Sequence, residues 1–146
     1  MSTIIDIADA VVTELNAAVE AKKFSQPFQA ARHYKPVFDL AEMKDLHVTV
    51  VPRGVEMSTA GRGLSQRDVQ IDIGVQKKLA TGELAEIDPL MGLVEEIGEY
   101  FREHRLSAMP NALWVRTENS PIFAPEHLDQ LRQFTSVVTL TFRVIG

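Results

Sequence analysis

The sequence contains no cysteine, which excludes disulfides, thiol nucleophiles and thiolate metal sites. It has no surplus of basic residues, since 15 lysines and arginines against 20 aspartates and glutamates give a net charge of −5. Tight non-specific binding of nucleic acid needs such a surplus. No apolar run reaches the roughly 18 residues of a membrane span, and the first residues lack the basic region and apolar core of a signal peptide. These absences predict a cytosolic protein without a membrane segment.

The composition that remains is that of an ordinary globular domain. The chain has 146 residues, of which 45% are hydrophobic and 24% charged, and this is the usual size of one domain. A chain of this length buries about two-thirds of its surface on folding. Because we find no internal repeat, low-complexity tract or linker, we expect a single domain over residues 1–146.

Two segments alternate apolar and polar residues, the pattern of strands with one buried face. In residues 69–76 the apolar positions are Val69, Ile71, Ile73 and Val75, and the polar ones include Gln70, Asp72 and Gln76. Residues 138–144 repeat the pattern, with Thr139, Thr141 and Arg143 on the polar side. Two such strands predict an antiparallel sheet with one dry face and one wet face.

An amphipathic helix is predicted near the N-terminus. Ser2 or Thr3 can cap it, and its apolar residues recur every three or four positions until the pattern fades around residues 22–24. Glu14 and Asn16 fall outside this apolar stripe, so we expect them on the solvent side.

A second helix is predicted to begin at Asp88 as N-cap, with Pro89 at the first helical position. Two glycines interrupt it, and each costs about 1 kcal/mol relative to alanine. Gly92 lies next to the apolar stripe, which suggests close packing on the sheet, whereas Gly98 has no such explanation.

The rest of the chain is predicted to be short strands and turns. Residues 25–35 are irregular and Pro52-Arg53-Gly54 ends a strand. Strands are expected at 37–40, 46–51, 55–59, 112–117 and 134–145, with turns at 60–65 and 125–131. The predicted fold class is α+β, with a mixed, mostly antiparallel sheet of about five strands and two helices packed on one face.

No residue pattern indicates catalysis, a cofactor or a metal. Gly61-Arg62-Gly63 is followed by a strand, whereas a phosphate loop needs further glycines and a helix. The four histidines have no metal-ligand spacing, and the glutamates at 95, 96, 99 and 103 suit a solvated helix face. Trp114 beside Arg116 is more typical of a core or an interface than of a stacking platform. We therefore expect no enzyme and no bound cofactor.

Four segments in this order, behind a leading amphipathic helix, resemble the tail terminator (tail-completion) proteins of long-tailed phages. The segments are Phe24-Ser25-Gln26-Pro27-Phe28-Gln29-Ala30-Ala31-Arg32-His33-Tyr34-Lys35-Pro36, then residues 46–54, then residues 70–78, and the closing residues 134–144. The similarity covers nearly the whole chain and is one of patterns, because this family has no catalytic signature.

The resemblance implies a structural function in the neck of a phage tail. Such proteins form a ring, usually a hexamer, on the last ring of the tail tube. The ring stops polymerisation of the tube protein and offers a docking surface to the head-completion or connector protein. DNA passes through its lumen without specific binding. The expected location is the tail-neck region of the virion, after assembly in the bacterial host cytoplasm, and a prophage origin is compatible with it.

Candidate contact residues for such a ring come from aromatic or basic loops and from the wet face of the sheet. They are Phe28, Tyr34, Arg53, Arg62, Arg67, Asp72, Thr141 and Arg143. Two alternatives stay open at this point: a head-completion or stopper protein that binds the portal side, and a small-molecule binding or regulatory domain. The first differs in which partner co-purifies, and the second needs a deep apolar pocket.

Overall fold

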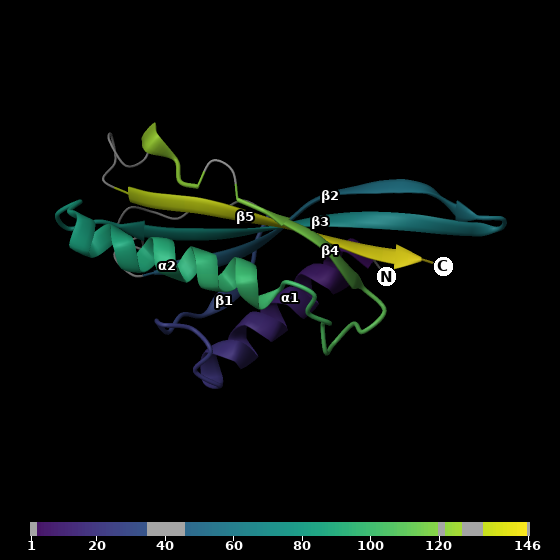
Figure 1. Ribbon diagram of the computed structural model, residues 1–146, viewed down its shortest axis with the longest axis horizontal. Coiled ribbons are helices and arrows are strands. Elements are labelled where there is room, and N and C mark those ends of the chain that lie inside the picture. The colour runs from purple at the N-terminus through teal and green to yellow at the C-terminus, as the bar shows by residue number, and fades with distance from the viewer. Residues whose placement is uncertain (1–2, 35–45, 120–121, 127–132, 146) are drawn as a thin grey trace.

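The computed structural model describes residues 3–34, 46–119, 122–126 and 133–145, and it confirms the predicted α+β class (Figure 1). Within these residues, two helices and five strands follow one another. They are α1 (Thr3–Glu20), β1 (Ala30–Arg32), β2 (His47–Gly61), β3 (Leu64–Lys78), α2 (Leu84–Tyr100), β4 (Leu113–Glu118) and β5 (Gln133–Ile145).

The five strands form one sheet in the order β1-β2-β3-β5-β4. β1 lies parallel to β2, and every other neighbouring pair is antiparallel. β2 and β3 make a long hairpin whose turn is Arg62-Gly63, where Gly63 has a φ of 75° that suits glycine. β5 pairs with β3 along its entire length, from Gln133 opposite Lys78 to Ile145 opposite Gln66.

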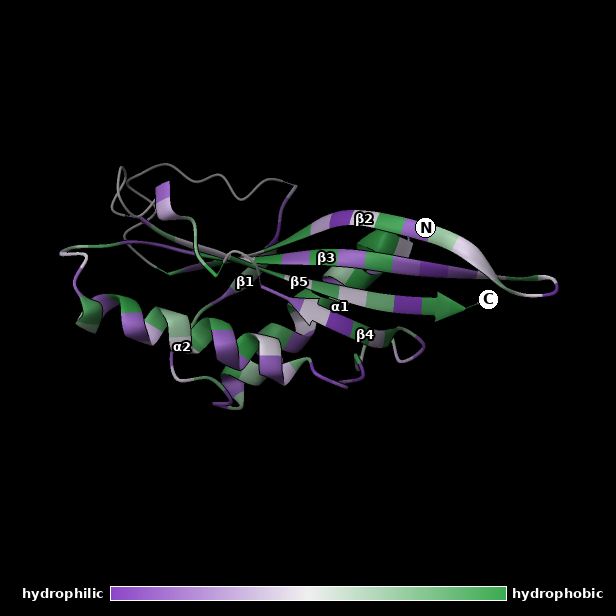
Figure 2. Cartoon of the chain, turned by 45° about the horizontal axis from the view of Figure 1, so that its top comes forward, coloured by the Kyte–Doolittle hydropathy of each residue, from purple (hydrophilic) through white to green (hydrophobic). Residues whose placement is uncertain are grey.

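Both helices cover the same face of the sheet, which we call the helix face (Figure 1). Val69, Ile71, Ile73 and Val75 are completely buried there, as the alternation of β3 predicts. Leu140 and Phe142 of β5 join them, together with Ile7, Val11 and Leu15 of α1 and Leu93 and Ile97 of α2. The alternating bands of hydropathy along β3 are visible in Figure 2. The alternation of side chains along each strand therefore separates the core from the opposite face.

β2 is longer than predicted, because Pro52-Arg53-Gly54 does not end the strand. The ladder with β3 continues to Gly61 through a register shift between Pro52 and Gly54. Proline is tolerated at bulges and on edge strands, where its missing N–H interrupts no ladder. In the described part of the chain, no strand lies on the outer side of β2 at this point.

One further strand lies in a stretch predicted to be irregular, and two predicted elements fall wholly or partly outside the described residues. β1 occupies residues 30–32 inside a stretch predicted to be irregular, where the Asn16 side chain bonds both the backbone N–H and the C=O of Ala30. The strand predicted at 37–40 lies outside the described residues. The helical turn predicted at 125–131 is described only at residues 125–126, which are helical.

α2 begins at Leu84, five residues before Pro89, the predicted first helical position, so that prediction was wrong. Glu83 is the N-cap, but its side chain makes no capping hydrogen bond. The carboxylate of Glu86 instead accepts the backbone N–H groups of Ala80, Thr81 and Gly82 at 2.8 to 3.0 Å. Pro89 consequently lies inside the helix. The three N–H bonds define the helix start more strongly than the capping preference of Asp88.

The glycines of α2 also differ from expectation. A Cβ atom added at Gly92 would meet no neighbouring atom within 4 Å, so close packing does not explain this glycine. At Gly98 such an atom would make an ordinary 3.6 Å contact with Thr117 Cγ2. Neither position requires glycine for space.

Candidate interaction surface

The sheet face opposite the helices, here called the open face, carries the alternate residues of the same strands. Its charged side chains come from four strands and include four carboxylates, three guanidiniums and one ammonium group. They are Glu56, Asp68, Asp72, Glu118, Arg53, Arg116, Arg143 and Lys78. Opposite charges are thus nearly balanced on this face.

A hydrogen-bonded group crosses three strands at the centre of the open face. Thr139 Oγ1 donates to Asp72 Oδ1 at 2.7 Å and accepts from Arg53 Nη1 at 3.2 Å. The guanidinium of Arg53 also lies 3.6 Å from the carboxylate of Asp72. Because the Arg53 side chain is 56% exposed, this ion pair contributes little to stability. It holds the basic side chain down on the sheet surface.

A second ion pair lies nearer the hairpin turn. Arg143 makes a bidentate contact with Asp68, with Nε at 2.8 Å and Nη2 at 3.1 Å from the two carboxylate oxygens. These hydrogen bonds lower the pKa of Asp68 and raise the pKa of Arg143. Cross-strand pairs of this kind specify the arrangement of charge on a sheet face.

The open face is buried at the end of the sheet away from the hairpin turn, where β1 pairs with β2. Thr49 is 1% exposed and Gln76 is 3% exposed. The Oγ1 of Thr49 and the Oε1 of Gln76 have no hydrogen-bond partner in the described part of the chain. Apart from Lys78, which is exposed at the end of β3, the charged side chains that reach solvent on this face lie toward the end with the hairpin turn.

Four of the predicted contact residues come together on the open face. Arg53, Asp72 and Arg143 make the ion pairs described above, and Thr141 lies between Gln70 and Arg116 in the strand register. Alternation predicted this grouping for the residues of β3 and β5. Alternation did not predict Arg53, which lies on β2 and joins the group through its contacts with Asp72 and Thr139.

The other four predicted residues lie elsewhere. Arg67 is on the helix face, where it donates to Thr3 Oγ1 at the start of α1, and Arg62 is in the hairpin turn. Phe28 packs on Phe24 with ring centroids 5.4 Å apart and borders the core. Tyr34 is 68% exposed and lies under the guanidinium of Arg32. The eight residues therefore do not form one continuous site.

A buried carboxylate that the sequence pattern placed in solvent connects α1 to the end of α2. Glu14 is 5% exposed, which corrects that prediction. Its carboxylate accepts the backbone N–H of Ser107 and lies 3.0 Å from His104 Nε2 and 3.4 Å from the Tyr100 hydroxyl. Burial raises the pKa of Glu14, but the bonds from Ser107 and His104 outweigh it and leave this pKa lowered.

The position of Glu14 in the sequence contained a usable signal. It lies four residues after Ala10 and four before Ala18, both of which are buried, so it belongs to the apolar stripe by spacing. Its partner His104 lies beyond the end of α2. The group joins α1 to the end of α2 and the segment that follows it.

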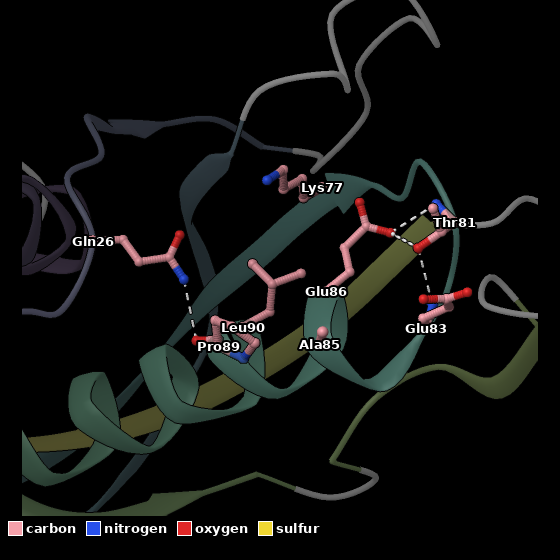
Figure 3. A pocket seen from close by; sticks show the side chains of 8 residues that line it. All are labelled: Gln26, Lys77, Thr81, Glu83, Ala85, Glu86, Pro89 and Leu90. Carbon is pink, nitrogen blue, oxygen red and sulfur yellow. Dashed lines mark hydrogen bonds between the residues drawn. The ribbon is translucent and has the colours of Figure 1, made fainter.

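A surface pocket of about 430 Å³ lies beside the start of α2 (Figure 3). Lys77 contributes a basic side chain to its lining, and Glu86 points toward Thr81 at its rim. The Glu86 carboxylate is occupied by three backbone N–H groups, which lower its pKa to about 2. Glu86 therefore fixes the start of the helix and is not free for acid–base chemistry.

Comparison with known proteins adds no family assignment, since no protein-family model matches this chain and no curated protein matches it. Within the described residues, no three histidine or acidic side chains are grouped as metal ligands. None of the helices there has the length and apolar character needed to cross a membrane.

Proposed function

We propose that this protein is a tail terminator of a long-tailed phage, acting as a hexameric ring that ends tail-tube polymerisation and joins the tail to the head. The observation that carries the proposal is the open face: a polar, nearly charge-balanced sheet surface that both helices leave uncovered. In the ring, the helices lie outside and the charged end of the open face lines the lumen.

The chemistry of this face suits a channel for DNA. A protein grips DNA when free lysines and arginines neutralise phosphates and release counterions. Here Arg53 and Arg143 already contact Asp72 and Asp68 of the same chain, and toward the hairpin turn the carboxylates on this face outnumber the basic side chains. The lumen therefore lets DNA slide without holding it, which an injection channel requires.

The partners follow from the same function. One rim of the ring contacts the tail tube protein and the other contacts the head-completion or connector protein. The protein acts in the tail-neck region of the virion and assembles in the cytoplasm of the bacterial host. It performs no catalysis and needs no cofactor.

Electron microscopy and phage genetics test this proposal. We expect six-fold rings of the purified protein in negative stain, alone or on tail tubes, and overlong or headless tails when the gene is deleted from its parent phage. Normal virions from the deletion strain would refute the proposal. Co-purification with the portal in place of the tail tube would favour a head-completion protein instead.

A further inference from the structure

Two edges of the sheet have no partner strand among the described residues, and they lie at the same height. We call the part of the sheet near the hairpin turn the tip half: residues 51–61 of β2, 64–72 of β3, 139–145 of β5, and β4. Within the described residues, β1 pairs only with residues 48–50 of β2, and β4 pairs only with β5. The outer edges of β2 from Val51 onward and of β4 therefore carry no strand in the part of the chain that the structure describes.

The strand registers show that these two edges are level. Gly54 is opposite Gln70, Gln70 is opposite Thr141, and Thr141 is opposite Arg116. In the same way Glu56 is connected through Asp68 and Arg143 to Leu113. A straight row across four strands thus joins one free edge to the other.

The directions of the two edge strands are also compatible. β2 runs toward the hairpin turn, and β4 runs away from it because it is antiparallel to β5. β4 of one copy placed beside β2 of another would therefore continue the antiparallel alternation of the sheet. Such a contact joins different surfaces of each copy, and heterologous contacts of this kind generate rings when the rotation closes.

Both edges expose side chains that proteins usually protect. Val55 is 42% exposed and Met57 is 64% exposed on β2, and Leu113 is 46% exposed on β4. An exposed strand edge with apolar residues is a template for pairing with another chain. The base of β2, by contrast, is covered by β1.

We infer that the outer edge of β2 in one copy pairs antiparallel with β4 of the next copy, so that the sheets of neighbouring subunits join edge to edge. This inference rests on the proposed ring and names the surface by which its subunits contact one another.

The alternation of side chains between the two faces and the pairing of opposite charges together determine the register of this contact. A shift by one position would turn every side chain of β4 to the wrong face, so only even shifts are allowed. With no shift, Arg116 lies beside Gly54 and close to Arg53. A shift of four positions toward the hairpin turn places Glu118 opposite Glu56. A shift of two positions places Arg116 opposite Glu56, and Glu118 opposite Gly54 and next to Arg53.

The two-position shift also pairs charged side chains that are available for a contact and brings apolar side chains of the two edges together. Among the described residues Glu56 has no ion pair within the chain, and the Arg116–Glu118 pair has side chains 50% and 64% exposed, so both partners are available. On the helix face the same register places Met57 beside Trp114 and Val55 beside Thr117. Sulfur–aromatic and β-branched contacts favour such pairs.

The size of the resulting barrel agrees with a wide channel. Four strands of the tip half in each of six copies make about 24 strands, and barrels of 16–18 strands already leave an aqueous channel. At about 4.8 Å between strands, the circumference is on the order of 115 Å and the diameter at least about 37 Å. Barrel closure needs a stagger between strands, which the two-position shift contributes.

Charge reversal gives the first test. E56R and R116E should each weaken self-association at least tenfold, measured by analytical ultracentrifugation, because like charges then meet across the contact. The double variant E56R/R116E should return to within about threefold of the natural protein. E103R, on an exposed side chain past the end of α2, is the matched control and should change nothing. Equal defects in both single variants without recovery in the double variant would overturn the charge pairing.

Cysteine cross-linking gives the second test, since the natural chain has no cysteine. Ser58 and Leu113 are both exposed and meet in the proposed register. Within one copy they are separated by three strand spacings, at least about 14 Å, beyond the roughly 7 Å limit for a disulfide. Oxidised S58C/L113C should therefore give a ladder of covalent multimers ending at the hexamer, and S58C/E118C should give none.

The outcomes separate this inference from the proposed function. Rings in the micrograph with no cross-link at S58C/L113C would overturn the edge contact and leave the ring in place. A cross-link at E56C/L113C instead would overturn the two-position shift. Monomers in every preparation, with neither rings nor cross-links in the presence of tail tubes, would overturn both proposals.

Discussion

The two faces of the sheet are made of alternate residues of the same strands, yet they differ in burial and in charge. Ile71 and Ile73 are completely buried on the helix face, whereas the side chain of Asp72, between them, remains 24% exposed on the open face and contacts Arg53 and Thr139. Apolar burial is the main stabilising contribution to a fold, and exposed ion pairs contribute little. The comparison teaches that one face stabilises the domain while the other is available for contacts.

A cavity on the helix face should give the largest effect. We expect I73A to lower the free energy of unfolding by about 2 to 5 kcal/mol, because it removes a completely buried side chain between the helices and the sheet. The control Q70A on the open face should change it by less than about 1 kcal/mol. Urea denaturation followed by circular dichroism measures both. Similar losses in the two variants would contradict the division between the faces.

The buried Glu14 carboxylate should have the next largest effect, since Glu14 is the one charged residue that is buried among the described residues. We expect E14Q to cost about 1 to 3 kcal/mol of stability at pH 7, because it weakens the bonds from Ser107 and His104.

The pH dependence of that effect has a defined sign. The pKa of Glu14 is lowered in the folded protein, so its contribution is complete above the unfolded value near 4.5 and is lost as the pH falls through the folded value. The difference in stability between the natural protein and E14Q should therefore shrink in acid. A difference that stays constant from pH 7 to pH 3 would show that the carboxylate charge is not what matters.

The bidentate pair on the open face should contribute less. We expect D68N to cost at most about 1 kcal/mol at pH 7, because Arg143 is more than one-third exposed and solvent screens the pair. The pKa of Asp68 is lowered by Arg143, so this contribution is present above pH 3.8 and disappears as the pH falls through the folded value. R143M with the Asp68 pKa followed by NMR provides the check, and an unchanged pKa would refute the assignment.

The smallest global effect is expected at Glu86, which is only half-buried. Its carboxyl should titrate with a pKa of about 2 because three backbone N–H groups bond to it, so this local contribution is present above pH 4.5 and is lost as the pH falls through about 2. In E86Q we expect faster amide hydrogen exchange at residues 80–82, while the urea midpoint of the whole domain hardly changes. Unchanged exchange at those amides would contradict the proposed role of Glu86 in starting α2.

Several features of the fold could be predicted because they depend on local periodicity. The alternation in residues 69–76 and 138–144 identified β3 and β5 and assigned their two faces. Successive side chains of a strand point to opposite faces, so once the apolar face is buried the face of every other side chain is fixed. Asp72, Thr141 and Arg143 lie on the open face for the same reason.

Other features could not be predicted because their cause lies far along the chain. Pro52 was expected to end a strand, but β1 stops at the level of Val50 and leaves an edge where a proline is tolerated. Glu14 was expected in solvent, but its partners His104 and Ser107 lie 90 and 93 residues away. Asp88 and Pro89 resembled a helix start until the three N–H groups bound by Glu86 placed the start earlier.

The amino-acid sequence by itself determined the class of the fold, the absence of thiol chemistry and the identity of the residues on each face of the two main strands. These properties follow from composition and from the geometry of single elements. Only the tertiary structure decided which edges of the sheet are left unpaired among the described residues and that they lie level with each other. The physical reason is that strand order and register are set by contacts between distant segments, and a local pattern contains no information about them.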